Sequence, residues 1–332
     1  MRIAVFHANK QPYAMNERIQ LLEATGLVEE VIAGSERQPT RLMPRGIIPY
    51  LVDVNSWTVQ IVLECLRTRR PWVIDSGDDP ATLARNRGSA HWRSTAYGLI
   101  NRFVVGGAAA VICRGQFHQP ILSRFAHGPV HYAPDTVADE ILDRDILVGD
   151  SQIISTFGSV PMPRTGDRAY GWEVIDVVAL YGKGITGVIV ANGPGQSALE
   201  TRAKRLGVAS QVHVLGGREM VELIKVLLPT GFVTSIQSND LAGWVRTTGK
   251  LPLSLGLRKY VVASAVGDAV TVLPHEALVR AKGDDDIVSE IATVVSRGIP
   301  QQWGIDAVRR AEPFRRSLVA KGLASFLEGS GV

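Results

Sequence analysis

A lysine stands at the end of a polar loop in the second half of the chain, where a helix is expected to begin. The apolar run at residues 232–236 predicts a buried strand, and Thr248, Gly249 and Lys250 open the segment that follows the loop. A helix starting near Lys250 would direct free backbone N–H groups, the positive end of its dipole and an ammonium group at one point. This combination predicts a binding site for an anionic group such as a phosphate.

Glycine-rich turns follow two other expected strands of the same half. They contain Gly193 and Gly195 after residues 187–191, and Leu215, Gly216 and Gly217 after residues 211–214. Glycine permits a tight turn, and a turn without side chains lets backbone amides approach a flat nucleobase closely. These residues are candidate contacts of a nucleotide. The alternative is a generic doubly wound fold, in which glycines also follow strands.

The elements that would position these residues alternate along the whole chain. Short apolar strands separated by helix-length segments predict parallel sheets built from βαβ units, and therefore an α/β fold. Strands are expected at residues 3–6, 31–32, 46–52, 72–74, 110–112, 130–132, 153–157, 187–191, 211–214, 232–236, 260–264 and 269–272. Helices are expected at residues 56–69 and 96–106, and residues 306–327 have helical apolar spacing.

Length and composition are those of an ordinary globular protein. The chain has 332 residues, 45% of them hydrophobic and 20% charged, which suffices for two domains of about 150 residues. Cys65 and Cys113 are too few for a disulfide framework or a cysteine-rich zinc site. No apolar run reaches the roughly 20 residues of a membrane-spanning helix. We therefore expect a cytoplasmic protein.

The charge balance is modestly basic, with a formal net charge of +4 and a pI of about 9.1. Arginines gather in three clusters, which are Arg67, Arg69 and Arg70; Arg85, Arg87 and Arg93; and Arg309, Arg310, Arg315 and Arg316. Such an excess suits an anionic membrane surface, a phosphorylated acceptor or nucleic acid. The alternative is that these arginines form solvated helix faces. Peripheral contact with a membrane is thus one open prediction.

Residues 250–264, KLPLSLGLRKYVVAS, resemble at matching length the segment KLxEYxAxGxPVVAS of two-domain retaining glycosyltransferases with the GT-B fold, in family 4 or group 1. Lys250, Leu251 and the VVAS run at 261–264 fit this pattern. Leu253 stands where the family has a glutamate that contacts the ribose of the nucleotide. Arg258 and Tyr260 replace a glycine and a proline. The run VIVANGPG at 188–195, with VHVLG at 212–216, resembles a second family segment at the family's spacing.

The resemblance implies two Rossmann-like doubly wound domains with an interdomain cleft and a C-terminal helix that returns to the N-terminal domain. The implied domains are an acceptor-binding domain at residues 1–148, a donor-binding domain at 149–305 and the returning helix at 306–332. The implied reaction transfers a sugar from a nucleoside diphosphate donor to an unidentified acceptor, with retention and without a metal or cofactor.

The resemblance also implies roles for basic residues of the second domain. Lys250, together with Arg164 or Arg168, would neutralise the departing diphosphate, because guanidinium groups bind phosphates in a bidentate manner without a metal. Gly158, Thr248 and Gly249 would lie beside the donor. For the arginines, the alternative is a plain surface turn at residues 161–167.

On the acceptor side, His7 and Asn9 follow the first expected strand, and ligands of open α/β sheets bind beyond the carboxyl ends of strands. Asp75, Asp78 and Asp79 follow another strand and would steer a sugar hydroxyl or act as a base. The alternatives are a histidine satisfied by a local hydrogen bond and an ordinary helix N-cap before a proline.

Metal binding receives little support from the sequence. His127 and His131 are separated by Gly-Pro-Val, which breaks the helix that would align them. Asp-x-Asp spacing occurs at residues 143–145 and 284–286, where solvated charge and helix capping explain it better. Two other functions stay open: a catalytically silent protein that binds a sugar nucleotide or a partner, and an enzyme acting on modified nucleic acid. The acceptor is then a small molecule, a lipid-linked glycan or a modified nucleic acid.

Overall fold

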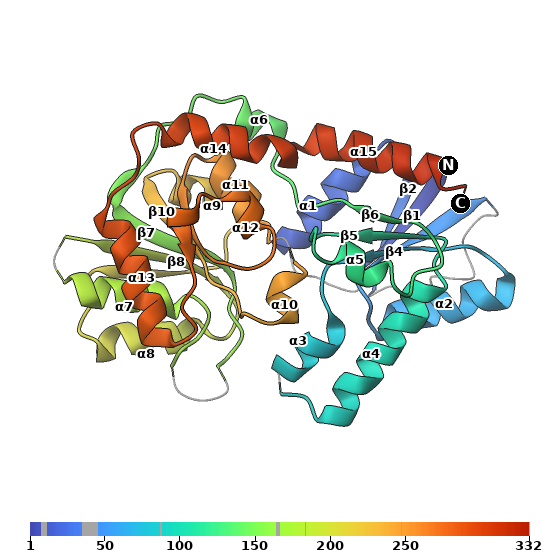
Figure 1. The fold of residues 1–332 in the computed structure, drawn as a ribbon, viewed down its shortest axis with the longest axis horizontal. Helices are drawn as coiled ribbons and strands as arrows, with labels where there is room; N and C mark the ends of the chain where they lie inside the picture. Colours follow the sequence, from blue (N-terminus) through green and yellow to red (C-terminus); the bar gives the residue numbers. More distant parts are fainter. Residues whose placement is uncertain are drawn as a thin grey trace. The chain divides into compact units, whose positions relative to one another are not determined.

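The computed structural model describes residues 1–7, 12–34, 46–86, 88–163, 167–182, 184–246 and 248–331. The chain forms two compact units (Figure 1). The first unit comprises Met1–Ala138, Asp240–Thr248 and Pro313–Val332, and the second comprises Asp139–Asn239 and Gly249–Glu312. Neither unit is therefore one continuous piece of the chain.

A parallel six-stranded sheet forms the centre of the first unit, in the order β2-β1-β3-β4-β5-β6. Its strands are β1 (Arg2–His7), β2 (Val28–Ala33), β3 (Ile47–Val52), β4 (Val73–Ser76), β5 (Ala110–Cys113) and β6 (Val130–Tyr132). Its helices are α1 (Pro12–Glu23), α2 (Ser56–Thr68), α3 (Pro80–Asn86), α4 (His91–Gly106), α5 (Gln119–Leu122), α10 (Leu241–Trp244) and α15 (Arg316–Gly329).

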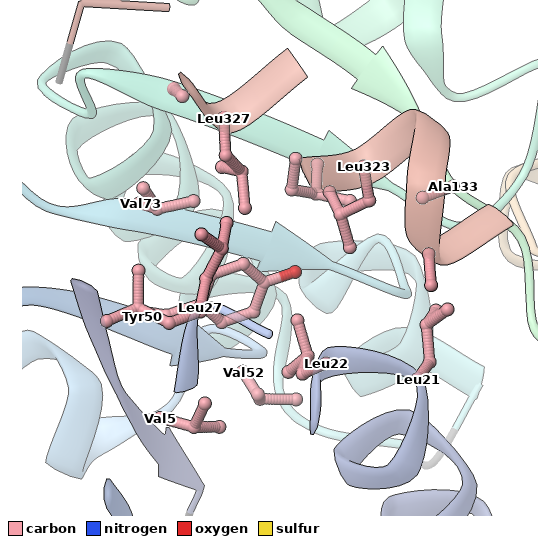
Figure 2. Close-up of a cluster of buried hydrophobic side chains, with 14 of the residues drawn as sticks. Val5, Leu21, Leu22, Leu27, Tyr50, Val52, Val73, Ala133, Leu323 and Leu327 are labelled. Carbon is pink, nitrogen blue, oxygen red and sulfur yellow. The ribbon is translucent and has the colours of Figure 1, made fainter. Parts of the chain in front are cut away.

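Alternating side chains of this sheet enter two separate cores, because successive side chains of a strand point to opposite faces. On one face, Val5 and Tyr50 pack with Leu21 and Leu22 of α1 and with Leu323 of α15 (Figure 2). On the other face, Phe6 and Leu51 of the same strands pack with residues of α2 and α4, which include Ile61, Val62, Val104 and Val105. The sheet is thus covered on both faces, as parallel sheets require.

The second unit contains another parallel six-stranded sheet, in the order β12-β11-β10-β7-β8-β9. Its strands are β7 (Asp150–Ser159), β8 (Thr186–Asn192), β9 (Val212–Gly216), β10 (Thr230–Ser235), β11 (Tyr260–Ser264) and β12 (Leu278–Val279). Its helices are α6 (Asp139–Leu142), α7 (Trp172–Tyr181), α8 (Gln196–Arg205), α9 (Met220–Leu227), α11 (Lys250–Gly256), α12 (Ala269–Val272), α13 (Asp284–Ser296) and α14 (Trp303–Ala311). Two parallel sheets with flanking helices confirm the predicted α/β fold.

One expected strand is wrong. Residues 269–272 form the short helix α12, and the edge strand is β12 instead. A four-residue apolar run does not distinguish a strand from one turn of a half-buried helix. The expected helical segment at 306–327 is also interrupted, since α14 and α15 are separated by a 3₁₀ turn containing Pro313 (Glu312–Phe314).

Helix α2 shows how local sequence defines an element. Asn55 caps its start by accepting hydrogen bonds from the amides of Trp57 and Thr58, and the Thr58 hydroxyl closes a capping box.

Among the described residues, no helix is both long and apolar enough to cross a bilayer.

Candidate functional site

The strand order of the second sheet makes two neighbouring loops diverge. The chain runs from β7 outward through β8 to β9 and then returns to β10, which pairs with the other side of β7. The loops after β7 and β10 therefore leave in opposite directions, and open α/β sheets bind ligands at such a switch point. Gly158 lies near the end of β7, and Lys250 follows β10 at the start of α11.

The ammonium group of Lys250 is held beside the end of β7. Lys250 is only 8% exposed. Its Nζ donates a hydrogen bond to the hydroxyl of Tyr170 and lies 3.5 Å from Thr156 Oγ1. It also lies 5.8 Å from the ring centre of Phe157. Since Thr156 and Phe157 are consecutive residues of β7, the positive charge lies at the switch point. α11 starts at this lysine, and its N-cap residue, Gly249, has no side chain that could cap it.

Two residues at the start of α7 join this arrangement and are absent from the sequence-based list. Tyr170 directly precedes the N-cap of α7, Gly171. Glu173, in the first turn, is buried, and its Oε1 accepts a hydrogen bond from Thr234 Oγ1 at 2.8 Å. Burial raises the pKa of Glu173, although this hydrogen bond and the charge of Lys250 act in the opposite direction. The signal that could have found both residues is their position at the first helix after the switch-point strand.

The predicted glycines come together along one row of the sheet. Gly158 of β7 is in register with Ala191 of β8, which is in turn in register with Gly216 of β9. Gly158 and Gly216 therefore lie two strands apart, about 10 Å. Leu215 precedes Gly216 in β9. This edge of the sheet lacks bulky side chains at both positions.

The turn after β8 requires its glycines. Gly193 has a φ of 139°, which residues with a side chain rarely adopt, and a Cβ there would lie 2.6 Å from the carbonyl oxygen of Val160. A Cβ on Gly195 would lie 2.4 Å from the carbonyl oxygen of Pro161. After β9, a Cβ on Gly217 would lie 3.0 Å from Asn192. These glycines keep backbone segments close together at the same edge.

Of the two predicted arginine partners of Lys250, Arg168 lies apart from this cluster. Arg168 forms ion pairs with Asp284 and Asp285 of α13, and its guanidinium lies 4.8 Å from the ring centre of Trp172. With its charge matched by two carboxylates, Arg168 gives no support to a role as diphosphate ligand. Arg164 lies outside the described residues. Thr248 and Gly249 flank the division between the units, with Thr248 in the first and Gly249 at the N-cap of α11.

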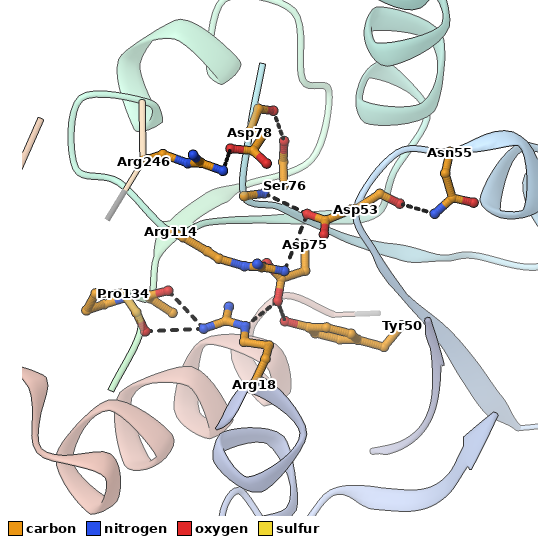
Figure 3. A network of polar contacts seen from close by, with 12 residues as sticks. Arg18, Tyr50, Asp53, Asn55, Asp75, Ser76, Asp78, Arg114, Pro134 and Arg246 are labelled. Atoms are coloured by element: carbon orange, nitrogen blue, oxygen red, sulfur yellow. Dashed lines mark hydrogen bonds and ion pairs between the residues drawn. The ribbon is translucent and has the colours of Figure 1, made fainter. Parts of the chain in front are cut away.

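In the first unit, the carboxylate of Asp75 lies within a buried polar network (Figure 3). This carboxylate accepts hydrogen bonds from Arg18 Nε, from the Tyr50 hydroxyl at 2.8 Å and from Arg114 Nε at 3.1 Å. Burial alone would raise the pKa of Asp75, but the charges of Arg18 and Arg114 and the hydrogen bonds outweigh it, and the pKa is lowered. A carboxylate so fully bonded is a weak base. The geometry therefore favours a structural role over the predicted catalytic one.

The other acceptor-side residues have local partners. Asp78 pairs with Arg246 at 2.8 Å. Asp79 Oδ1 accepts a hydrogen bond from the amide of Thr82 at 2.7 Å, which is the N-cap alternative of the sequence analysis. His7 ends β1, in register with Val52. Asn9 lies outside the described residues.

Charged groups missed by the sequence analysis surround the same edge of the first sheet. They are Arg18, Asp53, Arg114, Asp135 and Arg246. Burial raises the pKa of both Asp53 and Asp135, against the lowering effect of Arg114. Arg18 Nη2 is buried and has no hydrogen-bond partner among the described residues. This edge can supply both acceptors and donors to a polar molecule.

Some of the residues considered for a metal have other contacts. The ring of His131 stacks on Phe326, with ring centres 4.6 Å apart. Asp284 and Asp285 bind Arg168. Across the described part of the chain, no group of three or more His, Cys, Asp or Glu side chains could hold a metal ion.

Comparisons with known proteins show which solved structures have a similar fold. No family model and no curated protein matches the sequence. Sucrose-phosphate synthase from Thermosynechococcus elongatus superimposes with a TM-score of 0.73 at 13% identity, over 99% of this chain and 98% of that one. HepE of Anabaena, solved with UDP and glucose, superimposes with a TM-score of 0.74 at 13% identity, over 99% of this chain and 100% of that one. WaaG, a glycosyltransferase involved in lipopolysaccharide biosynthesis, superimposes with a TM-score of 0.65 at 12% identity, over 98% of this chain and 100% of that one.

The chain has the GT-B fold. Two departures of this GT-B chain from the pattern at residues 250–264 have structural counterparts. Leu253 is 2% exposed, so an apolar side chain fills the place of the glutamate. Arg258 has a φ of 58°, and glycine is the residue that adopts this left-handed conformation without cost. A residue in the left-handed conformation thus stands where the family pattern has glycine.

Proposed function

We propose that the protein is a glycosyltransferase that moves a sugar from a nucleoside diphosphate donor to an acceptor, with the donor bound by the second unit. The observation that carries this proposal is the position of Lys250. Its ammonium group lies at the switch point of the sheet, beside Gly158 and held by Tyr170. HepE, which has the same fold, was solved with UDP and glucose. UDP and UDP-glucose are therefore the first ligands to test.

In the proposed reaction, positive charge develops on the sugar while negative charge develops on the departing diphosphate. Lys250 would stabilise that negative charge, because a fixed cation in a water-poor site stabilises a developing anion strongly. The glycine row at Gly158 and Gly216 would let the nucleotide approach the backbone. Glu173, buried beside this cation, would balance its charge in the absence of ligand.

Retention of configuration and independence of a metal are part of the proposal. With a lysine as the counter-charge of the diphosphate, turnover should persist in the presence of EDTA. The anomeric configuration of the product, followed by NMR from the first minutes, would decide between retention and inversion. On the acceptor side, the carboxylates and guanidinium groups at the edge of the first sheet suit a hydroxyl-rich molecule such as a sugar.

A second candidate is a catalytically silent protein that binds a sugar nucleotide. Leu253 favours it, since this buried apolar side chain cannot hydrogen-bond to a ribose. Two such hydrogen bonds are worth about 0.5 to 1.5 kcal/mol each. Nucleotide binding without donor hydrolysis or transfer would support this candidate. A steep decrease of acceptor binding with salt would instead support a modified nucleic acid as acceptor.

The proposal is tested by exchanging Lys250 for alanine. The variant should bind UDP and UDP-glucose roughly 10- to 100-fold more weakly in calorimetry, because a charge-assisted hydrogen bond is lost. Lys282→Ala, an exposed lysine of the same unit, is the matched control and should bind as the unchanged protein does. Equal affinities of Lys250→Ala and the control would disprove the donor site. Thermal unfolding of both variants would show that the fold is intact.

A further inference from the structure

Helix α4 of the first unit exposes an apolar stripe. Trp92, Leu99 and Phe103 are 66%, 62% and 49% exposed. Their spacing of seven and four residues places them within about 40° of one another around the helix, at 100° per residue. On the opposite side, Val104 and Val105 are fully buried in the core. The helix is therefore apolar on its core face and on its outer face.

The surrounding sequence is free of negative charge. Residues 80–134 contain six arginines and neither aspartate nor glutamate, although the whole chain has 32 acidic residues among 332. The net charge of this 55-residue stretch is +6, and the rest of the chain has −2. Figure 1 shows α4 at the periphery of the first unit, where it contacts α2 and α3. Of these arginines, Arg93 and Arg102 lie on α4, whereas Arg114 is largely buried and pairs with Asp53 and Asp75.

Two of these arginines flank the stripe on α4 itself. Arg93 lies about 100° to one side of Trp92, and Arg102 about 80° to the other. Arg93 lies 5.1 Å from the ring centre of Trp92, and Arg102 lies 6.0 Å from that of Phe125. Both are exposed, and neither forms an ion pair with a carboxylate in the described ranges. Their charges are available to an external anion.

We propose that the outer face of α4 binds an anionic lipid surface. Trp92, Leu99 and Phe103 would enter the boundary between headgroups and acyl chains, where aromatic and aliphatic side chains of interfacial helices lie. Arg93 and Arg102 would bind lipid phosphates on both sides of the stripe. A second copy of the chain fits less well, because pairing this face with itself would oppose like charges. The inference goes beyond the proposed function and does not depend on the donor site.

Sedimentation with vesicles tests this surface, using the full chain. Phosphatidylcholine vesicles are compared with vesicles containing about one third phosphatidylglycerol, since basic side chains respond to anionic lipid. The unchanged protein should sediment with the anionic vesicles, and salt should reduce the bound fraction. Arg93→Gln with Arg102→Gln should lower the partition coefficient about fivefold for each arginine. Trp92→Ser with Leu99→Ser and Phe103→Ser should lower it at least tenfold.

Matched variants distinguish binding through this surface from nonspecific adsorption to vesicles. Leu180→Ser with Ile305→Ser removes two exposed apolar side chains of the second unit, 60% and 77% exposed, and should sediment as the unchanged protein does. Because the triple variant could fail to fold, thermal unfolding and UDP binding accompany each measurement, and the double arginine variant gives an independent answer. Equal binding of the arginine variant and the unchanged protein would overturn the proposal. So would a lack of binding to anionic vesicles, or self-association that the triple variant abolishes.

Discussion

Gly158 leaves room for Lys250: a Cβ on Gly158 would lie 3.2 Å from Lys250 Cε and 3.6 Å from its Nζ. Gly158 also has a φ of 140°, which disfavours any side chain. Gly158→Ala should therefore lower the free energy of unfolding by about 1 to 3 kcal/mol and should weaken UDP binding by displacing the ammonium group. Urea unfolding and calorimetry measure the two effects. Gly207→Ala, with a φ of 73° and open space around it, is the control and should affect stability alone.

Tyr170 positions the same lysine. Tyr170→Phe removes the hydroxyl that accepts the hydrogen bond from Lys250 but keeps the ring. The Michaelis constant for the donor should rise about 2- to 10-fold, the equivalent of one hydrogen bond. A Michaelis constant unchanged within error would contradict the positioning role. Tyr181→Phe, which removes a hydroxyl bonded to the carbonyl of Ala292, tests whether any lost tyrosine hydroxyl in this unit has the same effect.

Arg258 should be replaceable by glycine with a gain in stability. Its φ of 58° costs a residue with a side chain about 1 kcal/mol, which glycine avoids. Arg258→Gly should therefore raise the free energy of unfolding by about 0.5 to 1 kcal/mol. Arg297→Gly is the comparison, because Arg297 at the end of α13 has a φ of −73° and gains nothing from glycine. Equal or opposite effects of the two substitutions would refute this reasoning.

His118 should make stability depend on pH below neutrality. Burial lowers its pKa from 6.5 to about 4, although nearby Asp79 and Asp78 act to raise it. Between these values the unfolded chain binds the proton and the folded chain does not, so stability falls as the pH decreases from 6.5 to 4. The slope contributed by this group is at most about 1.4 kcal/mol per pH unit. The difference between the unchanged protein and His118→Gln, followed by unfolding across this range, should show that slope.

Asp75 should matter for stability more than for chemistry. Asp75→Ala would leave Arg18 buried without its carboxylate partner, and breaking a buried ion pair costs about 3 to 5 kcal/mol. If Asp75 were instead a catalytic base, the same substitution would lower turnover and leave stability unchanged. Asp79→Ala, which removes a helix cap, should cost only about 1 kcal/mol. Measured stability and turnover of both variants distinguish the two roles.

Local patterns predicted most strands, the helix start at Lys250 and the glycine turns, because strand and helix periodicity and tight turns are written in neighbouring residues. The partners of the site residues were missed for the opposite reason. Tyr170 and Lys250 are 80 residues apart, and Arg18 and Asp75 are 57 apart. Only the sheet topology brings such pairs together, and no local pattern marks them. The strand wrongly expected at 269–272 shows that short apolar runs need tertiary context.

The core of the first unit also has a consequence for synthesis on the ribosome. Leu323 and Leu327 of α15 pack in the same cluster as Leu21, Leu22 and Tyr50. The sheet that these early residues help to form therefore keeps one face incompletely covered until residues beyond 320 have been translated. The second unit, whose residues all precede Pro313, can complete its own core sooner. The part of the chain that is made first is thus the last to be finished.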